Sequence, residues 1–419
     1  MPPKSTGARK RSYTEGTSTC KPLRLDRLGR VSRVSLSGIA QLLEDVKDNF
    51  PAHFSRQTQI RARKRTCSTA TPFGPLVQSL DSGGVAIPYQ HPLAILWEAT
   101  GMASYQALMA RARVEGHHTL MIYADGVSPQ DGLSKHDRRK LVVVYWSILQ
   151  FDDALCGEDA WFPLAALRET LVASVPGGFS RVLRDLIRGA FFSDAYDARK
   201  GVHLQDDMRF VIDSLALLGD IPALAEMAAV KGHGAFKGCV ICRNVVLRRW
   251  WKPTLVDCVD HTSLETHRFV LHTETTFREV ISRIREAAPI MSSAEFEELQ
   301  IVHGVHYVPH GLVFADDLGV TPLHFMNDWM HTYLVGGLAD VELGLLMCEL
   351  RARRSQVTYE AVGAYMRLWK WPRHIEQHGT SFAKLFDEQV ANTHLEGKRF
   401  SCTSSEPLSL IPVLQLYFR

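Results

Sequence analysis

Residues 208–232 read MRFVIDSLALLGDIPALAEMAAVKG, and this stretch determines the fold class that we expect. Its apolar run ends at Asp220, and Pro222 stands where proline favours the first turn of a helix. The stretch therefore predicts a buried strand, an acidic residue at the end of that strand, and then a helix. A strand that leads directly into a helix is typical of an α/β protein.

A second stretch repeats the strand and the acid. Residues 117–129 read HHTLMIYADGVSP. Their apolar run extends to Ala124, and Asp125 and Gly126 end it. Another long strand is expected at 139–151, RKLVVVYWSILQF. Two neighbouring strands of this pattern should pair antiparallel.

Asp125 and Asp220 thus each stand at the end of a buried strand. A single aspartate in such a place usually caps a turn or a helix. Carboxylates brought together from different strand ends, however, form an oxygen-rich site that suits Mg²⁺ or Mn²⁺. Two such ions about 4 Å apart activate a nucleophile and stabilise the leaving oxygen in phosphodiester chemistry. A third acid is normally required.

The overall composition is that of a soluble globular protein. The chain has 419 residues, of which 46% are hydrophobic and 22% charged, enough for two or three structural units. No apolar run approaches the roughly 20 residues of a membrane helix, and the N-terminus lacks the apolar stretch of a secretory signal. Eight spread cysteines do not form a disulfide framework, so we expect a reducing compartment and no membrane partner.

Five segments are expected along the chain. The first is a disordered arm with nine Lys or Arg against two acidic residues. Its charge fits phosphate contact, nuclear targeting or a solubilising tail, and Arg9, Lys10 and Arg11 are its candidate DNA contacts. The segments are a basic arm over 1–33, a helical entry module over 34–116 with a loop region up to about residue 90, an α/β core over 117–275, a mainly helical insertion over 276–380, and a C-terminal return to the core over 381–419.

A Cys-x-x-Cys pair, Cys239 and Cys242, indicates an unfinished metal site. A structural zinc site has four nitrogen or sulfur ligands, so two partners are missing. His374 and His378 are remote candidates, because residues four apart project from one face of a helix. The local candidates are His233, Cys258, His261 and His267.

Two further motifs, NDWMH and LRRWWKP, each allow a structural and a functional interpretation. Asp328 and His331, in NDWMH, are expected inside an apolar helix, either as a buried hydrogen-bonded pair or as part of a site. The segment LRRWWKP at 247–253 combines cations with two tryptophans, which suits phosphate contact and base stacking. The tryptophans would equally suit a core anchor beside the zinc. The candidate DNA contacts of this segment are Arg248, Arg249 and Lys252.

Five features follow the order found in eukaryotic cut-and-paste DNA transposases. They are YADG around Asp125, LGDIPAL around Asp220, the Cys-x-x-Cys pair, NDWMH, and SCTSSEPLSLIPVL around Glu406. With these, the chain over roughly 117–419 resembles the catalytic region of the CACTA (EnSpm-like) and Plavaka-like group. The recombinase of vertebrate antigen-receptor assembly is a more distant relative of that group.

The resemblance implies a ribonuclease H-like core, with a mixed sheet flanked by helices and a helical insertion ahead of the third acid. It implies that Asp125, Asp220 and Glu406 are the catalytic Mg²⁺ or Mn²⁺ ligands. It also implies that His374 and His378, the remote pair, are the two remaining zinc ligands. NDWMH matches the Asp/Cys-x-x-His signature of the family.

As a transposase, the chain would cut transposon ends with two metal ions, join them to target DNA, work in the nucleus and form a homo-oligomer. Two features depart from the family. No separate DNA-binding domain is evident, and the chain ends 13 residues after Glu406, which suggests a truncated or decayed copy. The polar start of SSEPLSLIPVL precedes an apolar helix, so Glu406 is expected in the first turn of that helix. Glu388 and Glu396 are alternative third acids.

Two other classes of function stay open. One is a catalytically inactive, transposase-derived DNA-binding protein that keeps the zinc and the fold. The other is a zinc hydrolase with His374 and His378 as catalytic ligands. The usual zinc hydrolase motif has Glu directly after its first histidine, whereas Ile375 stands there, so this class is disfavoured.

Overall fold

The computed structural model divides the chain into two units, Met1–Thr66 and Cys67–Arg419. The predicted arm and the first part of the helical entry module, up to residue 63, lie outside the described residues, and so do Arg9, Lys10 and Arg11. Within the described part, no helix has the length and apolar character needed to cross a membrane. The described residues are 64, 67–127, 140–247, 249–252, 255, 257–263, 265–334, 337–353, 358–372, 379–397, 399–400, 402 and 405–418.

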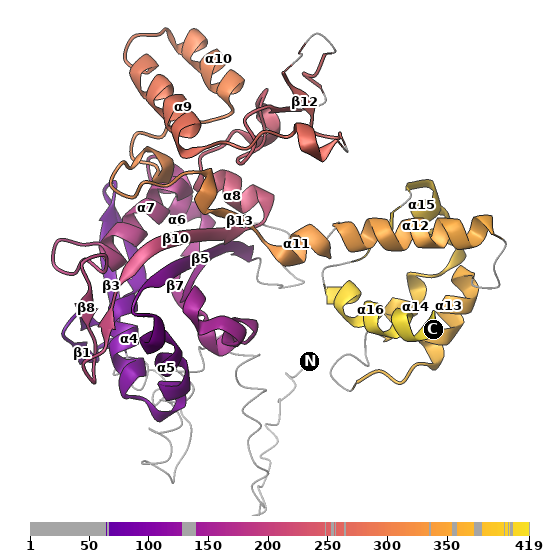
Figure 1. Ribbon diagram of the computed structural model, residues 1–419, viewed down its shortest axis with the longest axis horizontal. Helices are drawn as coiled ribbons and strands as arrows, with labels where there is room; N and C mark the ends of the chain where they lie inside the picture. The colour runs from indigo at the N-terminus through magenta and orange to yellow at the C-terminus, as the bar shows by residue number, and fades with distance from the viewer. Residues whose placement is uncertain are drawn as a thin grey trace, which may run out of the picture. The chain divides into compact units, whose positions relative to one another are not determined.

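A five-stranded mixed sheet flanked by helices forms the centre of the second unit (Figure 1). Its strands are β5 (His118–Val127), β6 (Leu141–Ile148), β7 (Phe162–Arg168), β10 (Ile212–Gly219) and β13 (Phe325–Asn327). The strand order is β13-β10-β5-β6-β7. β5, β10 and β13 run parallel, whereas β6 is antiparallel to both β5 and β7. The antiparallel pair predicted at 117–129 and 139–151 is confirmed.

The alternation of side chains along β5 separates a core face from a second face. Leu120, Ile122 and Ala124 are at most 2% exposed and belong to the main hydrophobic core. Tyr123 and Asp125 point to the other side of the sheet, because successive side chains of a strand alternate, and both are half-buried. The acid therefore lies on the less covered face of the sheet.

Helices cover the core face. The helices α4 (Pro92–Gly101), α5 (Gln106–Glu115) and α7 (Gly178–Phe191) lie beside the sheet (Figure 1). Their buried side chains belong to the main hydrophobic core. The buried residues of α7 are spaced three or four apart along much of the helix and form its apolar stripe. Asp220 follows β10 directly and caps α8 (Ile221–Met227), so the predicted order of strand, acid and helix is also confirmed.

Two expectations are wrong. Residues 70–90 were expected to be a loop region of a helical module, but they form β1 (Ala70–Thr71), β2 (Gly74–Pro75), β3 (Val77–Ser82) and β4 (Val85–Gln90). Positive φ angles at Gly83 and Gly84 allow the tight turn between β3 and β4, so these glycines join two strands. The second error concerns β13, an edge strand of the sheet that comes from inside the range predicted as a helical insertion.

A second hydrophobic core lies in the C-terminal part, and its buried side chains come from helices and from the segments that connect them. Its buried side chains include Val362, Phe386 and Leu410. The helices are α12 (Leu338–Ala352), α13 (Tyr359–Leu368), α14 (Gly379–Lys384), α15 (Glu388–Gly397) and α16 (Ser405–Tyr417). The other described α-helices and strands of the second unit are short connections or lie around the sheet. They are α6 (Glu169–Ser174), α9 (Glu274–Ala287), α10 (Ser293–His303), α11 (Trp329–Tyr333), β8 (Val202–His203), β9 (Arg209–Phe210), β11 (Val245–Val246) and β12 (Val259–Asp260).

His118, at the start of β5, joins three elements of the core. Its ring is fully buried, with Nδ1 at 2.8 Å from the Val211 carbonyl oxygen and Nε2 at 2.8 Å from that of Ala112. The ring also stacks on Phe210, with 4.6 Å between centroids. Both ring nitrogens therefore contact buried carbonyl groups that would otherwise have fewer partners.

We expect His118→Phe to lower the free energy of unfolding by about 1–3 kcal/mol, because a buried carbonyl group loses its hydrogen bond while the ring volume is kept. Urea unfolding measures the change. His117→Phe is the matched control, since the side chain of His117 is 68% exposed, and it should change stability by less than about 0.5 kcal/mol. Equal stability of the two variants would show that these contacts contribute nothing.

Candidate active site

The strand register brings three aspartates to one edge of the sheet. Leu218 of β10 pairs with Tyr123 of β5. Asp220 and Asp125 each stand two residues further along their parallel segments, so they lie at the same level of the sheet. Gly219 of β10 pairs with Asn327 of β13. Asp220 and Asp328 each stand one residue further along, so they also lie at the same level. The carboxyl ends of three adjacent parallel strands thus carry one acid each.

Two of these acids also begin helices. Asp220 Oδ1 accepts a hydrogen bond from the Ala223 N–H at 2.7 Å and caps α8. Asp328 Oδ1 accepts one from the Met330 N–H at 2.7 Å and caps α11. NDWMH was expected inside a helix, but Asp328 instead stands at the junction of β13 and α11.

Asp328 holds His331. The His331 Nδ1 atom lies 2.7 Å from Asp328 Oδ2, so the imidazole donates its Nδ1 hydrogen to the carboxylate. The Tyr123 hydroxyl also hydrogen-bonds to Asp328, and burial together with the nearby acids raises the pKa of that hydroxyl. Tyr123, Asp328 and His331 therefore form one hydrogen-bonded group on the second face of the sheet.

The charges of the cluster act on Asp125. Burial raises the pKa of the Asp125 carboxyl, and Asp220 and Asp328 raise it further. A hydrogen bond from the Gly126 N–H and the nearby His331 act in the opposite direction. Because the acids repel one another, a divalent cation bound among them would stabilise their ionised forms.

Asp125 and Asp220 fit a Mg²⁺ or Mn²⁺ site better than Asp328 does. The hydrogen bonds of Asp220 described above involve one carboxylate oxygen, whereas both oxygens of Asp328 are already engaged. Asp328 is therefore better suited to positioning His331 than to binding a metal. In the described residues, no three His, Cys, Asp or Glu side chains are already arranged as a metal site.

Glu406, the predicted third acid, lies in the first turn of α16, as expected for that helix. Its neighbours belong to the C-terminal helical core, where burial, Asp340 and Glu406 raise the pKa of the Cys402 thiol. The electrostatic effects on Asp125 come from Asp220, Asp328 and His331. Glu406 as a third metal ligand therefore stays a prediction.

Cys239 and Cys242 form a tight turn with a prepared thiolate. The Cys242 N–H donates a hydrogen bond to Cys239 Sγ at 3.3 Å. The hydrogen bond from the Cys242 thiol, together with backbone N–H groups, lowers the pKa of Cys239 to about 6 against the effect of burial. The pKa of Cys242 is raised by that same hydrogen bond and by burial. A thiolate is the form of cysteine that binds zinc.

The ligands that would complete this zinc site are still predictions. His374 and His378 lie outside the described residues. Of the local candidates, His261 contacts Asp260, with 3.1 Å between Nδ1 and Oδ1. Neither Cys258 nor His261 forms a three-residue metal group with the cysteines in the part of the chain that is described.

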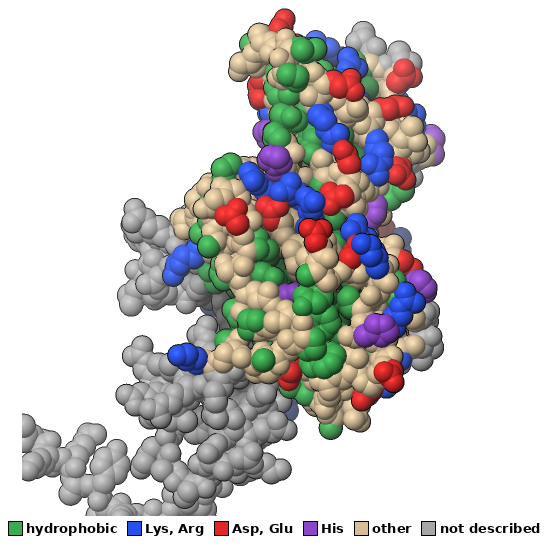
Figure 2. All heavy atoms as spheres, turned by 90° about the vertical axis from the view of Figure 1, so that its left-hand side faces the viewer, with side chains coloured by type: hydrophobic (Ala, Val, Ile, Leu, Met, Phe, Trp, Pro, Cys, Tyr) green, Lys and Arg blue, Asp and Glu red, His purple; other side chains and the backbone are tan. Residues whose placement is uncertain are grey.

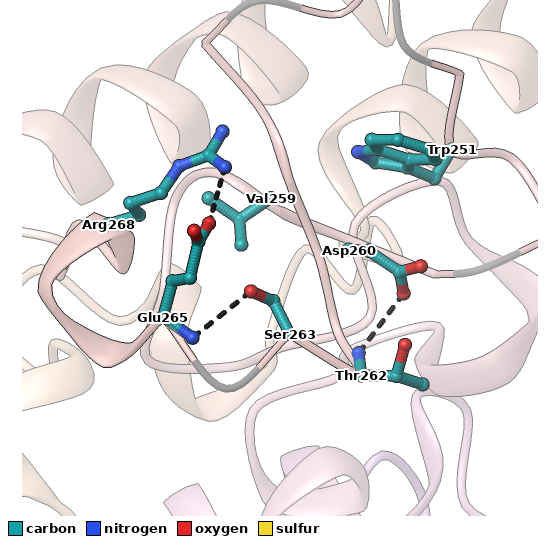
Figure 3. A pocket seen from close by; sticks show the side chains of 7 residues that line it. All are labelled: Trp251, Val259, Asp260, Thr262, Ser263, Glu265 and Arg268. Carbon is teal, nitrogen blue, oxygen red and sulfur yellow. Dashed lines mark hydrogen bonds and ion pairs between the residues drawn. The ribbon is translucent and has the colours of Figure 1, made fainter.

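The segment after the cysteines lines a pocket of about 300 Å³ (Figure 3). Trp251 lies on one side of it, and the Thr262 N–H donates to Asp260 Oδ1 at 3.0 Å. Arg268 and Glu265 form an ion pair of 2.7 Å across from them. Trp251 is thus a wall of a pocket and not a fully buried anchor.

Of the predicted DNA contacts in LRRWWKP, Arg248 lies outside the described residues. Arg249 places its guanidinium 5.3 Å from the centre of the Trp250 ring, and Trp250 is 43% exposed. Lys252 is exposed. This arrangement is compatible with phosphate contact.

Basic side chains elsewhere pair with acids. Figure 2 shows Lys and Arg side chains interspersed with Asp and Glu on one face of the molecule. Arg188 of α7 pairs with Asp317 at 2.9 Å, and Arg285 of α9 pairs with Asp316 at 2.9 Å. These pairs fasten the segment before β13 to two helices, so they serve the fold.

We expect removal of residues 1–33 to weaken DNA binding equally at all sequences and to flatten the dependence of log affinity on log salt concentration. Each lost phosphate contact should reduce the slope by about 0.9 on duplex DNA, because fewer counterions are released. Fluorescence anisotropy at several salt concentrations measures it. A full-length variant with Gln at the nine basic positions of the arm controls for length and should behave like the truncation. An unchanged slope would exclude phosphate contact by the arm.

No protein-family profile matches the chain, and no curated protein is significantly similar to it. The chemistry of the site therefore has to be inferred from its own residues.

The sequence interpretation did not identify two residues of this site. Tyr123 stands two positions before Asp125, so strand alternation alone places both on one face. Glu226 of α8 lies near Asp220, and the pKa of its carboxyl is raised mainly by burial. Glu226 had no comparable signal in the sequence, because its nearness depends on how α8 packs.

Proposed function

We propose that this protein is a DDE-type DNA transposase of the CACTA and Plavaka-like kind, which cuts and joins DNA strands with Mg²⁺ or Mn²⁺. The proposal rests on one observation. Asp125, Asp220 and Asp328 lie at the same level, near the carboxyl ends of three parallel strands. Acids from separate strands that meet at one edge suit hard cations and phosphoryl transfer. DNA as substrate, action in the nucleus and assembly into a homo-oligomer belong to the same proposal.

The strand arrangement supports a ribonuclease H-like core. In sequence order, the five sheet strands comprise an antiparallel meander of three, β5 to β7, followed by two strands added parallel on the other side of β5. The first acid lies near the carboxyl end of the central strand, and the second follows its parallel neighbour. This is the arrangement that the resemblance implies.

In this mechanism, Asp125 and Asp220 would hold the cations, and a bound cation would supply charge neutralisation at the phosphate and activation of water. The parallel strands fix the two carboxylates, and the cap on α8 orients Asp220. Asp328 holds the His331 imidazole in one orientation beside the cluster. The contribution of the chain is thus positioning and charge compensation, without a protein nucleophile.

A nicking assay tests the proposal. The parent protein should nick supercoiled DNA with Mn²⁺ or Mg²⁺ and not with a chelator present. Metal-dependent nicking would support a catalyst, whereas DNA binding without any nicking would favour the inactive, transposase-derived binding protein.

The third acid has its own expected result. Glu406→Gln should slow nicking at least about a hundredfold, because Gln keeps the shape and removes the charge that holds a cation. Glu360→Gln, which changes an exposed acid of α13, is the matched control and should retain the parent rate. If Glu406→Gln cuts like the parent, the third acid is another residue, with Glu388, Glu396 and Asp328 as the next to test.

A further inference from the structure

Positive charge gathers where the Cys-x-x-Cys segment packs against α9 and α10, and its cations differ from the acid-paired ones described above. Lys237 and Arg243 flank the two cysteines in the sequence, and Arg283 stands on α9. Arg243 and Arg283 are exposed, and Lys237 is half-buried. Within the described residues, none of the three forms an ion pair with an acid. By sequence, none of the undescribed residues between 230 and 334 is an acid.

Backbone contacts bring these cations to one place. The Lys237 carbonyl group lies so close to Gly304, the residue after α10, that a Cβ atom there would clash with it. The Arg243 N–H donates to the Val270 carbonyl oxygen at 2.9 Å, shortly before α9 begins. α9 and α10 themselves lie side by side (Figure 1). Lys237, Arg243 and Arg283 thus form one group, the basic patch.

Two histidines near the basic patch respond to its charge. Burial, followed by the charges of Lys237 and Arg243, lowers the pKa of His272 to about 4. Burial also lowers the pKa of His303, and Arg283 and Lys237 lower it further. Lys237 therefore acts together with a different arginine on each ring. Both histidines are neutral at pH 7, so the positive charge of the patch comes from its lysine and its arginines.

A group of cations without acidic partners in the described part of the chain favours a polyanionic ligand. Each cation repels the others until negative charge lies among them. The neighbouring segment LRRWWKP adds an exposed ring, Trp250, with the Arg249 guanidinium 5.3 Å from its centre. The Leu247 N–H, at the start of that segment, donates to the carbonyl oxygen of Phe236, next to Lys237, at 3.2 Å. Cations beside an exposed aromatic ring are typical of a nucleic-acid-binding surface.

The basic patch lies one short helix away from the candidate active site. Asp220 caps the start of α8, and the Lys231 N–H, shortly after the end of α8, donates to the Gly304 carbonyl oxygen at 2.9 Å. Lys237 lies against the same glycine. α8 has seven residues and is therefore about 10 Å long. About three nucleotides of one DNA strand span such a length.

We propose that Lys237, Arg243 and Arg283 form a phosphate-binding surface for the backbone of the DNA that flanks the reacting phosphate. Such contacts position DNA and do not read its sequence. The inference rests on the proposed function, because it takes DNA as the ligand. It adds the surface along which the flanking backbone lies.

Binding of the full chain to a mixed-sequence duplex, measured by fluorescence anisotropy between about 50 and about 200 mM salt, tests the proposal. Arg283→Gln should weaken binding at low salt and reduce the slope of log affinity against log salt by about 0.9, because one phosphate contact is lost. Over that range the variant should lose about 3.5-fold less affinity than the parent. Gln at all three positions should reduce the slope by about 2.7.

Two variants of α9 control the result. Arg278→Gln removes a charge from the same helix, but Arg278 already pairs with Glu274 at 2.9 Å, so the parent slope should be kept. Arg283→Lys keeps the charge and should also keep the parent slope. Equal flattening by Arg278→Gln and Arg283→Gln would overturn the proposal, because the net charge of the chain would then account for binding. An unchanged slope of the triple variant would overturn it in favour of an acidic protein partner.

The variant at Arg283 also guards against an effect on the cysteines. Lys237 and Arg243 stand close to the candidate zinc ligands in the sequence, so the zinc content and the melting temperature of the triple variant are measured beside its DNA binding. Arg283 lies outside that segment, and Arg283→Gln should match the parent in both. If the triple variant loses zinc, the slope of Arg283→Gln decides, and a parent-like slope there would overturn the proposal.

The nicking assay separates this inference from the proposed function. If nicking depends on metal and on Asp125, but the triple variant keeps the parent slope, the phosphate-binding surface alone is rejected. If no nicking occurs, but Arg283→Gln flattens the slope and Arg278→Gln does not, the surface stands and the catalytic proposal fails.

Discussion

Asp125→Asn and Asp220→Asn are each expected to lower the rate of metal-dependent DNA cleavage at least about a thousandfold. In the proposed mechanism, each change removes a charged ligand from a site whose cations would supply several kcal/mol of transition-state stabilisation. Nicking of supercoiled DNA with Mn²⁺ measures the rate. Isothermal titration with Mn²⁺ measures the loss of metal affinity separately.

The fold should survive both substitutions. Asn caps a helix about as well as Asp, so Asp220→Asn keeps the start of α8. Asp213→Asn is a matched control, because it changes an acid at the opposite end of the same strand, β10. Cleavage at the parent rate by either site variant would exclude that aspartate as a metal ligand.

Cys239→Ser is expected to remove a bound zinc ion and to unfold the segment between α8 and α9. Metal binding and local folding are coupled, and structural zinc sites contribute on the order of 10 kcal/mol in small zinc peptides. The purified parent should contain about one zinc per chain by elemental analysis. Limited proteolysis should cut the variant within this segment, and Cys156→Ser, at an exposed cysteine elsewhere, should match the parent.

Histidine variants then identify the remaining ligands. His374→Asn should release zinc if the site closes through the remote pair, whereas His261→Asn should release it if the site closes locally. A well-folded parent without zinc would reject the metal site altogether. In that case Cys239, whose pKa is lowered by the hydrogen bond from the Cys242 thiol, would be the cysteine to test for reactivity instead.

The parts of the fold that could be predicted were those with a local signal. The β10 run, Asp220 and Pro222 indicate a strand, a cap and a helix within a few residues, and the structure has all three. The first turn of α16 at Glu406 followed from the same kind of pattern.

The missed parts depend on contacts between distant residues. β13 has only three residues, too few for a periodic pattern, and it is defined by its pairing with β10. The level position of Asp328 with Asp220 depends on that same register, so the sequence offered Asp328 only as a helix residue. The identity of the residues that would complete the zinc site also depends on distant parts of the chain. The remote candidates, His374 and His378, lie outside the described residues.

The helix cap at position 220 indicates what selection has retained at the site. Ser, Thr, Asn and Asp all cap helices, so folding alone would accept any of them at position 220, whereas the Asp328 carboxylate also holds His331. Position 220 carries the only one of the four that bears a charge, beside Asp125, whose ionisation it disfavours. A chain shaped by folding alone would gain from a neutral cap there. The retained charge is therefore a cost to stability, and a mutational scan that scored only stability should prefer Asn or Ser at 220, while one that scored DNA cleavage should accept only Asp.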